Sequence, residues 1–136
     1  MIAYAETVIS PKEIALFRKI EEAVSRLPEI DLGKDEDGEE IILSCHILTR
    51  AVSRVFSLKY RDGIWHQYYD HSWLVTKHGH IIDVYPVAVI GGPIMVDRRV
   101  TDRLYRIKRI GRGVKRSSFR RAVSLVAQEL RKPPKV

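Results

Sequence analysis

One stretch of the chain, residues 44–86, carries three residue types in the order that thiol enzymes use. Cys45, the only cysteine among the 136 residues, is followed by His71 and then by Asp83. A cysteine attacks as its thiolate, a nearby imidazole takes the thiol proton, and a carboxylate fixes the tautomer of that imidazole. These three residues therefore predict a nucleophile, a general acid/base and an orienting group for acyl transfer.

The sequence predicts that Cys45 opens a helix. Apolar residues recur at helical spacing from about 45 to 58, and Ser44 suits the cap position before them. A cysteine in the first turn of a helix lies near unpaired amides and the positive end of the helix dipole, which favour a thiolate and could hold an oxyanion. The alternative is that Cys45 is a small buried apolar residue, which is the commoner role of a lone cysteine.

The two partners of Cys45 are expected on strands of one sheet. Arg61-Asp62-Gly63 is interpreted as a turn, followed by strands over 64–69, 71–76 and 80–85, with Lys77-His78-Gly79 as a three-residue hairpin loop. If Thr76 pairs with His80, His71 and Asp83 share one sheet face as diagonal neighbours.

Asp83 interrupts the apolar run Ile81–Tyr85, which otherwise reads as a buried strand. A buried carboxylate requires a compensating partner, and a ring N–H of His71 would supply one. An edge-strand aspartate facing water is the alternative. Trp73, two residues after His71, has two interpretations as well: it contacts substrate at the wall of the site, or it packs in the core.

The other histidines, His46, His66, His78 and His80, are weaker candidates for the base. A zinc site built from Cys45, His78 and His80 matches none of the common Cys/His spacings, so no metal is expected. The acidic segment 29–40 lacks carboxylates at the required positions of a calcium loop and is expected to be a solvated loop.

The remaining segments complete a single domain over residues 1–136. A helix is expected from Pro11 to about residue 27, strands at 94–96 and 104–110, and a last helix beginning at Ser117-Ser118 and ending before Pro133. The terminal helices are expected to close a core with the central sheet.

Charge is distributed unevenly along the chain. Residues 1–96 hold 10 basic and 14 acidic residues, a formal charge of −4, whereas residues 97–136 hold 14 and 3, a formal charge of +11. A basic C-terminal part predicts an anionic partner, although a solvated basic face explains it equally well.

The lone cysteine, the absence of a signal-like start and the lack of an apolar run of about 20 residues predict a cytoplasmic protein without a membrane span. Delivery as an effector fits by analogy alone.

At Cys45, His71-Ser72-Trp73 and Ile82-Asp83, the sequence resembles the transglutaminase-like branch of the papain-like cysteine enzymes. The resemblance covers about a third of the chain and implies Cys45 as nucleophile, His71 as general acid/base and Asp83 as the orienting carboxylate. The pattern Cys-x-x-Leu-x-Arg-Ala from Cys45 also looks like the leader peptidases of lasso-peptide biosynthesis, within the same branch. No glutamine precedes Cys45, so the residue that usually supplies the second oxyanion donor of papain-like peptidases has no counterpart here, and the sequence does not identify that donor.

The sequence thus predicts an α+β fold with an antiparallel sheet, the nucleophile helix packed on it and a papain-like or transglutaminase-like core. The expected activity is cysteine-dependent acyl transfer at an amide bond of a peptide or protein, through a thioester and without a cofactor. Water as acceptor gives a peptidase, amidase or deamidase, and an amine gives a transglutaminase. The alternative is a non-catalytic binding module whose basic C-terminal part binds nucleic acid or an acidic partner.

Overall fold

The computed structural model describes residues 2–3, 9–27, 37–38, 44–67, 69–85, 92–100, 104–108 and 113–131. In chain order the elements are β1 (Ile2–Ala3), α1 (Pro11–Ser25), α2 (Cys45–Phe56), β2 (Lys59–Trp65), β3 (Tyr69–Val75), β4 (Ile81–Asp83), β5 (Ile94–Val96), the 3₁₀ turn η1 (Arg98–Val100), β6 (Tyr105–Ile107) and α4 (Arg116–Arg131). The predicted helices agree with α1, α2 and α4 to within about two residues.

The strands form one sheet in the order β1-β5-β4-β3-β2-β6. All neighbours pair antiparallel except β1, which runs parallel to β5 at the edge. The general α+β class and the antiparallel centre of the sheet were predicted. The parallel edge strand was not, because β1 is too short to show a period in the sequence.

The predicted turn at Arg61-Asp62-Gly63 is wrong, because these residues lie inside β2, which pairs with β3 from Lys59 opposite Val75 to Trp65 opposite Tyr69. The chain reverses after β2 instead, where His66 and Gln67 take positive φ values of 50° and 70°. Gly63 serves close packing rather than a turn. A Cβ there would lie 2.1 Å from the Arg106 carbonyl oxygen and 2.5 Å from the Trp73 ring.

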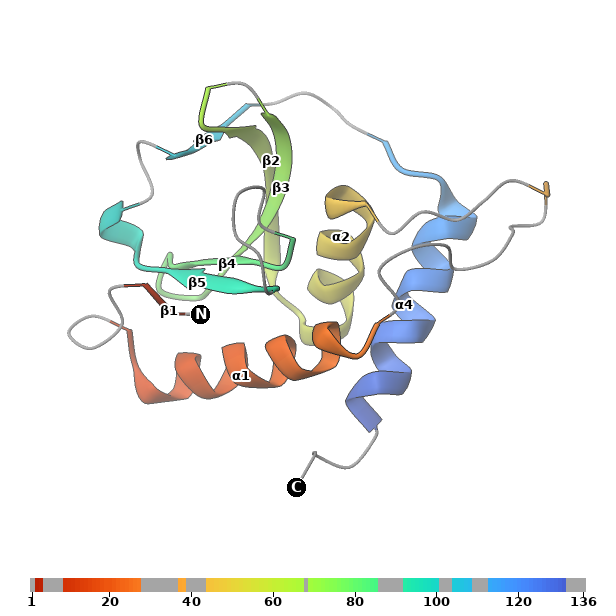
Figure 1. Cartoon of the computed structure of the whole chain (residues 1–136), viewed down its shortest axis with the longest axis horizontal. Coiled ribbons are helices and arrows are strands. Elements are labelled where there is room, and N and C mark those ends of the chain that lie inside the picture. Colours follow the sequence, from red (N-terminus) through yellow and green to blue (C-terminus); the bar gives the residue numbers. More distant parts are fainter. Residues whose placement is uncertain are drawn as a thin grey trace.

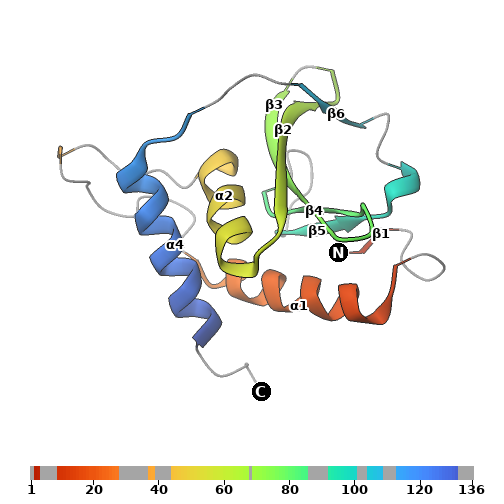
Figure 2. The ribbon, with the colours of Figure 1, turned by 180° about the vertical axis from the view of Figure 1, so that it is seen from behind.

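The sheet divides the molecule into two regions, which Figures 1 and 2 show from opposite sides. The helices α2 and α4 lie beside one face of β2 and β3, and β6 and η1 lie beyond the other. The larger core joins that helical face to α1, α2 and α4; it includes Phe17, Leu48, Val52, Leu74 and Ile82. The smaller core, on the opposite face, contains Trp73, Ile81, Val96 and Tyr105.

Apart from residues 37–38, the predicted acidic loop lies outside the described residues. The predicted strand 104–110 is represented by β6, which pairs with β2 through Gly63 opposite Ile107.

Candidate active site

Cys45 is the first residue of α2, as predicted. Ser44 caps the helix with an extended backbone, and its hydroxyl accepts a hydrogen bond from the Ile47 amide at 3.3 Å. Cys45 is half-buried and belongs to neither of the two cores. Because the first amides of a helix have no acceptor within it, the Cys45 N–H is placed to stabilise negative charge next to the sulfur.

The hairpin formed by β3 and β4 has the predicted register. Leu74 lies opposite Ile82 and Val75 opposite Ile81, and the Thr76 amide donates to the His80 carbonyl at 2.8 Å. Gly79 has a φ of 86°, the left-handed conformation expected for the third loop residue. Continued by one pair, this register brings His71 and Asp83 to the same face of the sheet.

The histidine and the aspartate are in direct contact. His71 Nε2 and Asp83 Oδ2 lie 2.8 Å apart, and both side chains are almost completely buried, with exposed fractions of 1% and 0%. Asp83 Oδ2 also accepts a hydrogen bond from the Tyr105 hydroxyl at 2.9 Å, and Oδ1 accepts one from the Tyr85 amide at 3.1 Å. Three donors therefore compensate a fully buried carboxylate, which excludes the water-facing alternative for Asp83.

The contact with Tyr105 requires a strongly curved sheet. Tyr105 lies on β6 and Asp83 on β4, and two strands separate them in the sheet. In a flat sheet these strands would lie about 14 Å apart, beyond the reach of a tyrosine side chain. The sheet therefore curls over the smaller core and brings its outer strands together around Asp83. Burial, followed by the charge of Asp83, raises the pKa of Tyr105, so its hydroxyl stays a donor.

The electrostatics link His71 to Cys45. Burial by itself lowers the pKa of His71, but the hydrogen bond to Asp83 and the proximity of Cys45 and Asp83 outweigh burial and raise it to about 9. Nδ1 of His71 is buried and has no other hydrogen-bond partner in the part of the chain that the structure describes. With Nε2 held by Asp83, Nδ1 is the atom that remains to exchange a proton with the Cys45 sulfur.

Trp73 is buried, with an exposed fraction of only 2%. Its ring centroid lies 6.3 Å from that of His71 and 5.2 Å from that of Tyr105, the latter in an edge-on arrangement. The predicted contact of Trp73 with substrate is therefore not available, because neighbouring core residues cover the ring. Trp73 instead packs beside the His71 imidazole, consistent with the core alternative.

A second polar network lies on the opposite face of β3, where it joins the helix to the sheet. His46 Nδ1 lies 2.6 Å from Ser72 Oγ, and the Ser72 hydroxyl donates its proton to Asp62 Oδ1. Because a hydroxyl has one proton, Ser72 Oγ accepts from His46 Nδ1–H. We call His46, Ser72, Asp62 and Arg50 the clamp. It ties the residue after Cys45 to the residue after His71, which fixes the first turn of α2 against β3.

Arg50 completes the clamp and balances its charge. Its guanidinium bonds to Asp62 Oδ2 at 2.7 Å and to the His46 carbonyl at 3.2 Å, and it lies 4.6 Å from the centre of the Tyr60 ring. Burial raises the pKa of Asp62, but the bonds from Ser72 and Arg50 outweigh that effect and lower it. Asp62 is thus an anion paired with a cation.

The remaining histidines serve other contacts. His78 Nδ1 lies 2.8 Å from a carboxylate oxygen of Glu13 on α1, which joins the hairpin loop to that helix. His80 is 1% exposed and its Nδ1 accepts from the Arg98 amide at 3.0 Å. Among the described residues no group of three or more His, Cys, Asp or Glu side chains gathers closely enough to hold a metal ion.

Sequence reasoning missed two features of the site, Tyr105 and the clamp. Tyr105 is 22 residues from Asp83 and only the curl of the sheet brings it close. The sequence did contain a sign of the clamp. Side chains along a strand point alternately to the two faces of the sheet, so Ser72 points away from His71 and Trp73, toward the helical face, where a polar residue needs a partner.

Comparisons with protein-family models, curated proteins and solved structures found no match for this chain. Within the described helices, none combines the length and apolarity needed to cross a bilayer. The function is therefore inferred from the geometry of the site.

Proposed function

We propose that the protein is a thiol enzyme that transfers the acyl group of an amide bond in a peptide or protein. The observation that carries the proposal is the arrangement around His71: one ring nitrogen is bonded to buried Asp83, while the other is unpaired among the described residues and Cys45 is close enough to raise the pKa of the ring. A thiol–imidazole–carboxylate triad requires this arrangement, with the carboxylate on one ring nitrogen and the thiol near the other.

The mechanism follows from these positions. At neutral pH His71 holds a proton on each nitrogen, because its pKa is about 9. The Cys45 thiolate attacks the amide carbonyl, and the Cys45 amide stabilises the oxyanion that forms. The C–N bond then breaks as His71 gives its Nδ1 proton to the leaving amine, which leaves a thioester on Cys45. Water or a second amine, deprotonated by His71, then releases the acyl group.

Asp83 keeps the imidazole in place through this cycle and stabilises its protonated form. A papain-like or transglutaminase-like core is part of the proposal, supported by a cysteine-opened helix packed beside an antiparallel sheet that carries the histidine and the aspartate on neighbouring strands. The choice between hydrolysis and transamidation depends on whether water or an amine reaches the thioester.

The test is the reactivity of the single thiol. We expect the folded protein at pH 6 to react with iodoacetamide at least tenfold faster than the urea-unfolded chain, because the imidazolium stabilises the thiolate. His71→Ala should remove this acceleration, and His46→Ala, which changes the neighbouring histidine, should retain most of it. Equal rates for folded and unfolded protein would contradict the proposal.

A second experiment detects the intermediate. After incubation with a mixture of peptides, the mass of the intact protein should reveal a thioester on Cys45 that is absent in Cys45→Ser.

A non-catalytic binding module is the second candidate, favoured by the exposed arginines along α4. Arg116, Arg120 and Arg121 are exposed and make no ion pair with any described residue. Affinity for nucleic acid that falls steeply with salt and is the same in Cys45→Ala would support this candidate.

A further inference from the structure

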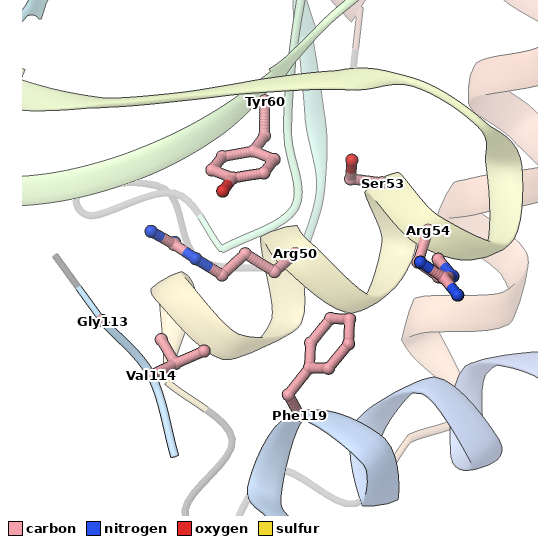
Figure 3. Close-up of a pocket in the computed structure, with 7 residues that line it drawn as sticks. All are labelled: Arg50, Ser53, Arg54, Tyr60, Gly113, Val114 and Phe119. Atoms are coloured by element: carbon pink, nitrogen blue, oxygen red, sulfur yellow. The ribbon is translucent and has the colours of Figure 1, made fainter. Parts of the chain in front are cut away.

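A pocket of about 420 Å³ lies beside the clamp, between α2, the start of β2 and the segment that leads into α4. Its lining includes two cations, Arg50 and Arg54, the hydroxyl-bearing Ser53 and Tyr60, and the apolar Val114 and Phe119. Figure 3 shows Arg50 extending from α2 toward the Tyr60 ring, with Phe119 pointing from α4 toward α2. The described lining contains no acidic side chain, so the pocket combines positive charge with an apolar wall.

The two arginines differ in how they are held. Arg50 is 7% exposed and fixed by Asp62, His46 and the Tyr60 ring. Arg54 lies one helical turn further along, is exposed, and has no ion pair or hydrogen bond with any described residue. Because Asp62 already balances Arg50, the uncompensated positive charge of the pocket belongs to Arg54.

The pocket is linked to the proposed active site through Arg50. Its guanidinium bonds to the His46 carbonyl at 3.2 Å and lies 3.4 Å from Ser72 Oγ, and these residues directly follow Cys45 and His71. Along the helix axis, Arg54, which carries the uncompensated charge, lies about 13.5 Å beyond Cys45 at 1.5 Å per residue. An extended peptide covers that distance in about four residues at about 3.3 Å each.

We propose that this pocket binds an acidic side chain, Glu or Asp, of the polypeptide substrate, about four residues from the amide that Cys45 attacks. The carboxylate pairs with Arg54, the Tyr60 hydroxyl provides a further donor, and the apolar part of the segment packs on Phe119 and Val114. The Ser53 hydroxyl is not available as a donor, because it bonds to the Leu58 carbonyl. This inference rests on the proposed function and adds to it the class of substrate. A carboxylate is selected over an amide of the same shape because only the carboxylate balances Arg54.

The test measures binding in the absence of catalysis. The probes are blocked, fluorescein-labelled octapeptides of alanine and leucine with one central Glu, Gln or Lys, titrated against the Cys45→Ala protein by fluorescence anisotropy. We expect the Glu peptide to bind about five- to tenfold more tightly than the Gln peptide at low salt, with a smaller ratio at 0.5 M NaCl. Arg54→Gln should reduce the ratio to below about twofold, and Arg54→Glu should favour the Lys peptide.

The matched control is Arg121→Gln, which removes an exposed arginine of α4 that does not line the pocket. This control should keep the full Glu preference. Equal binding of the Glu and Gln peptides, no binding of either, or the same loss of preference in Arg54→Gln and Arg121→Gln would overturn the pocket assignment. Since Cys45 is absent from the assay, those results leave the thiol reactivity untouched. An unreactive Cys45 with an intact Glu preference would instead refute the proposed function alone.

Discussion

The two faces of β3 carry two networks of similar composition and different chemistry. On one face, His71 meets Asp83 and the Tyr105 hydroxyl; on the other, His46 meets the Ser72 hydroxyl, which bonds to Asp62. Each therefore contains an imidazole, a hydroxyl and a carboxylate. His71 and Ser72 are neighbours on β3 but belong to different networks, because successive side chains of a strand point to opposite faces of the sheet.

The difference between the networks lies in how each carboxylate is balanced. Asp83 has no arginine or lysine among its described partners, so its charge acts on His71 and supports the imidazolium. Asp62 is paired with Arg50, and a hydroxyl separates it from His46. The same residue types thus give an imidazole bonded to a carboxylate without a basic partner among the described residues on one face, and a charge-balanced clamp on the other. In the proposed mechanism, charge balance, more than residue type, makes His71 rather than His46 the base.

The largest expected effect separates the two carboxylates. Asp83→Asn should slow alkylation of Cys45 at pH 7 by about a hundredfold or more, because an amide neither supports the imidazolium nor selects the productive tautomer. Asp62→Asn should change that rate by less than about threefold, because Asp62 does not contact His71. Second-order alkylation rates measured by mass spectrometry, with circular dichroism as the control for folding, test the pair. Equal losses would show that both networks serve catalysis.

Breaking the charge balance of the clamp should have the next largest effect. Arg50→Met leaves Asp62 partly buried without its cation, and we expect a loss of about 2–4 kcal/mol in the free energy of unfolding. Urea denaturation measures this loss. In the double variant Arg50→Met/Asp62→Asn much of the loss should be recovered, since no unpaired charge remains. Failure of the second substitution to recover stability would show that packing of the arginine stem dominates.

The two networks should also lose stability at opposite ends of the pH range. The pKa of His71 is raised from 6.5 to about 9, so its contribution is complete below pH 6.5 and is lost as pH rises through 9, on the order of 3 kcal/mol. The pKa of Asp62 is lowered, so its contribution is present at neutral pH and is lost in acid. His71→Gln should flatten the alkaline limb of a stability–pH curve, and Asp62→Asn the acid limb. An alkaline limb unchanged in His71→Gln would refute the assignment.

The smallest effects should separate the two hydroxyls. Tyr105→Phe removes one donor from Asp83 and should slow alkylation of Cys45 about three- to tenfold. Ser72→Ala removes the link between His46 and Asp62 and should lower the free energy of unfolding by about 1 kcal/mol, with little change in rate. A rate loss in Ser72→Ala as large as that in Tyr105→Phe would show that the clamp also sets the distance between sulfur and imidazole.

The sequence predicted the parts of the site that depend on local rules. Ser44 and the apolar spacing predicted the helix that begins at Cys45, and the three-residue loop ending in Gly79 predicted the register of His71 and Asp83. Prediction from the sequence failed where the role of a residue depends on contacts with residues distant in the chain. Gly63 looked like a turn residue, but the approach of Trp73 and Arg106 demands a glycine inside β2. Tyr105 could not be predicted as a partner of Asp83, since no local pattern encodes the curl of a sheet.

That curl affects when the site forms during synthesis. Cys45, His71 and Asp83 leave the ribosome before Tyr105, and β6 has to pair with β2 before its tyrosine hydroxyl reaches the carboxylate. A nascent chain that ends before β6 would leave Asp83 short of a donor and its surroundings open to water, which weakens its hold on the imidazole. In the proposed mechanism, Cys45 therefore reaches its full nucleophilic strength only after β6 has paired with β2.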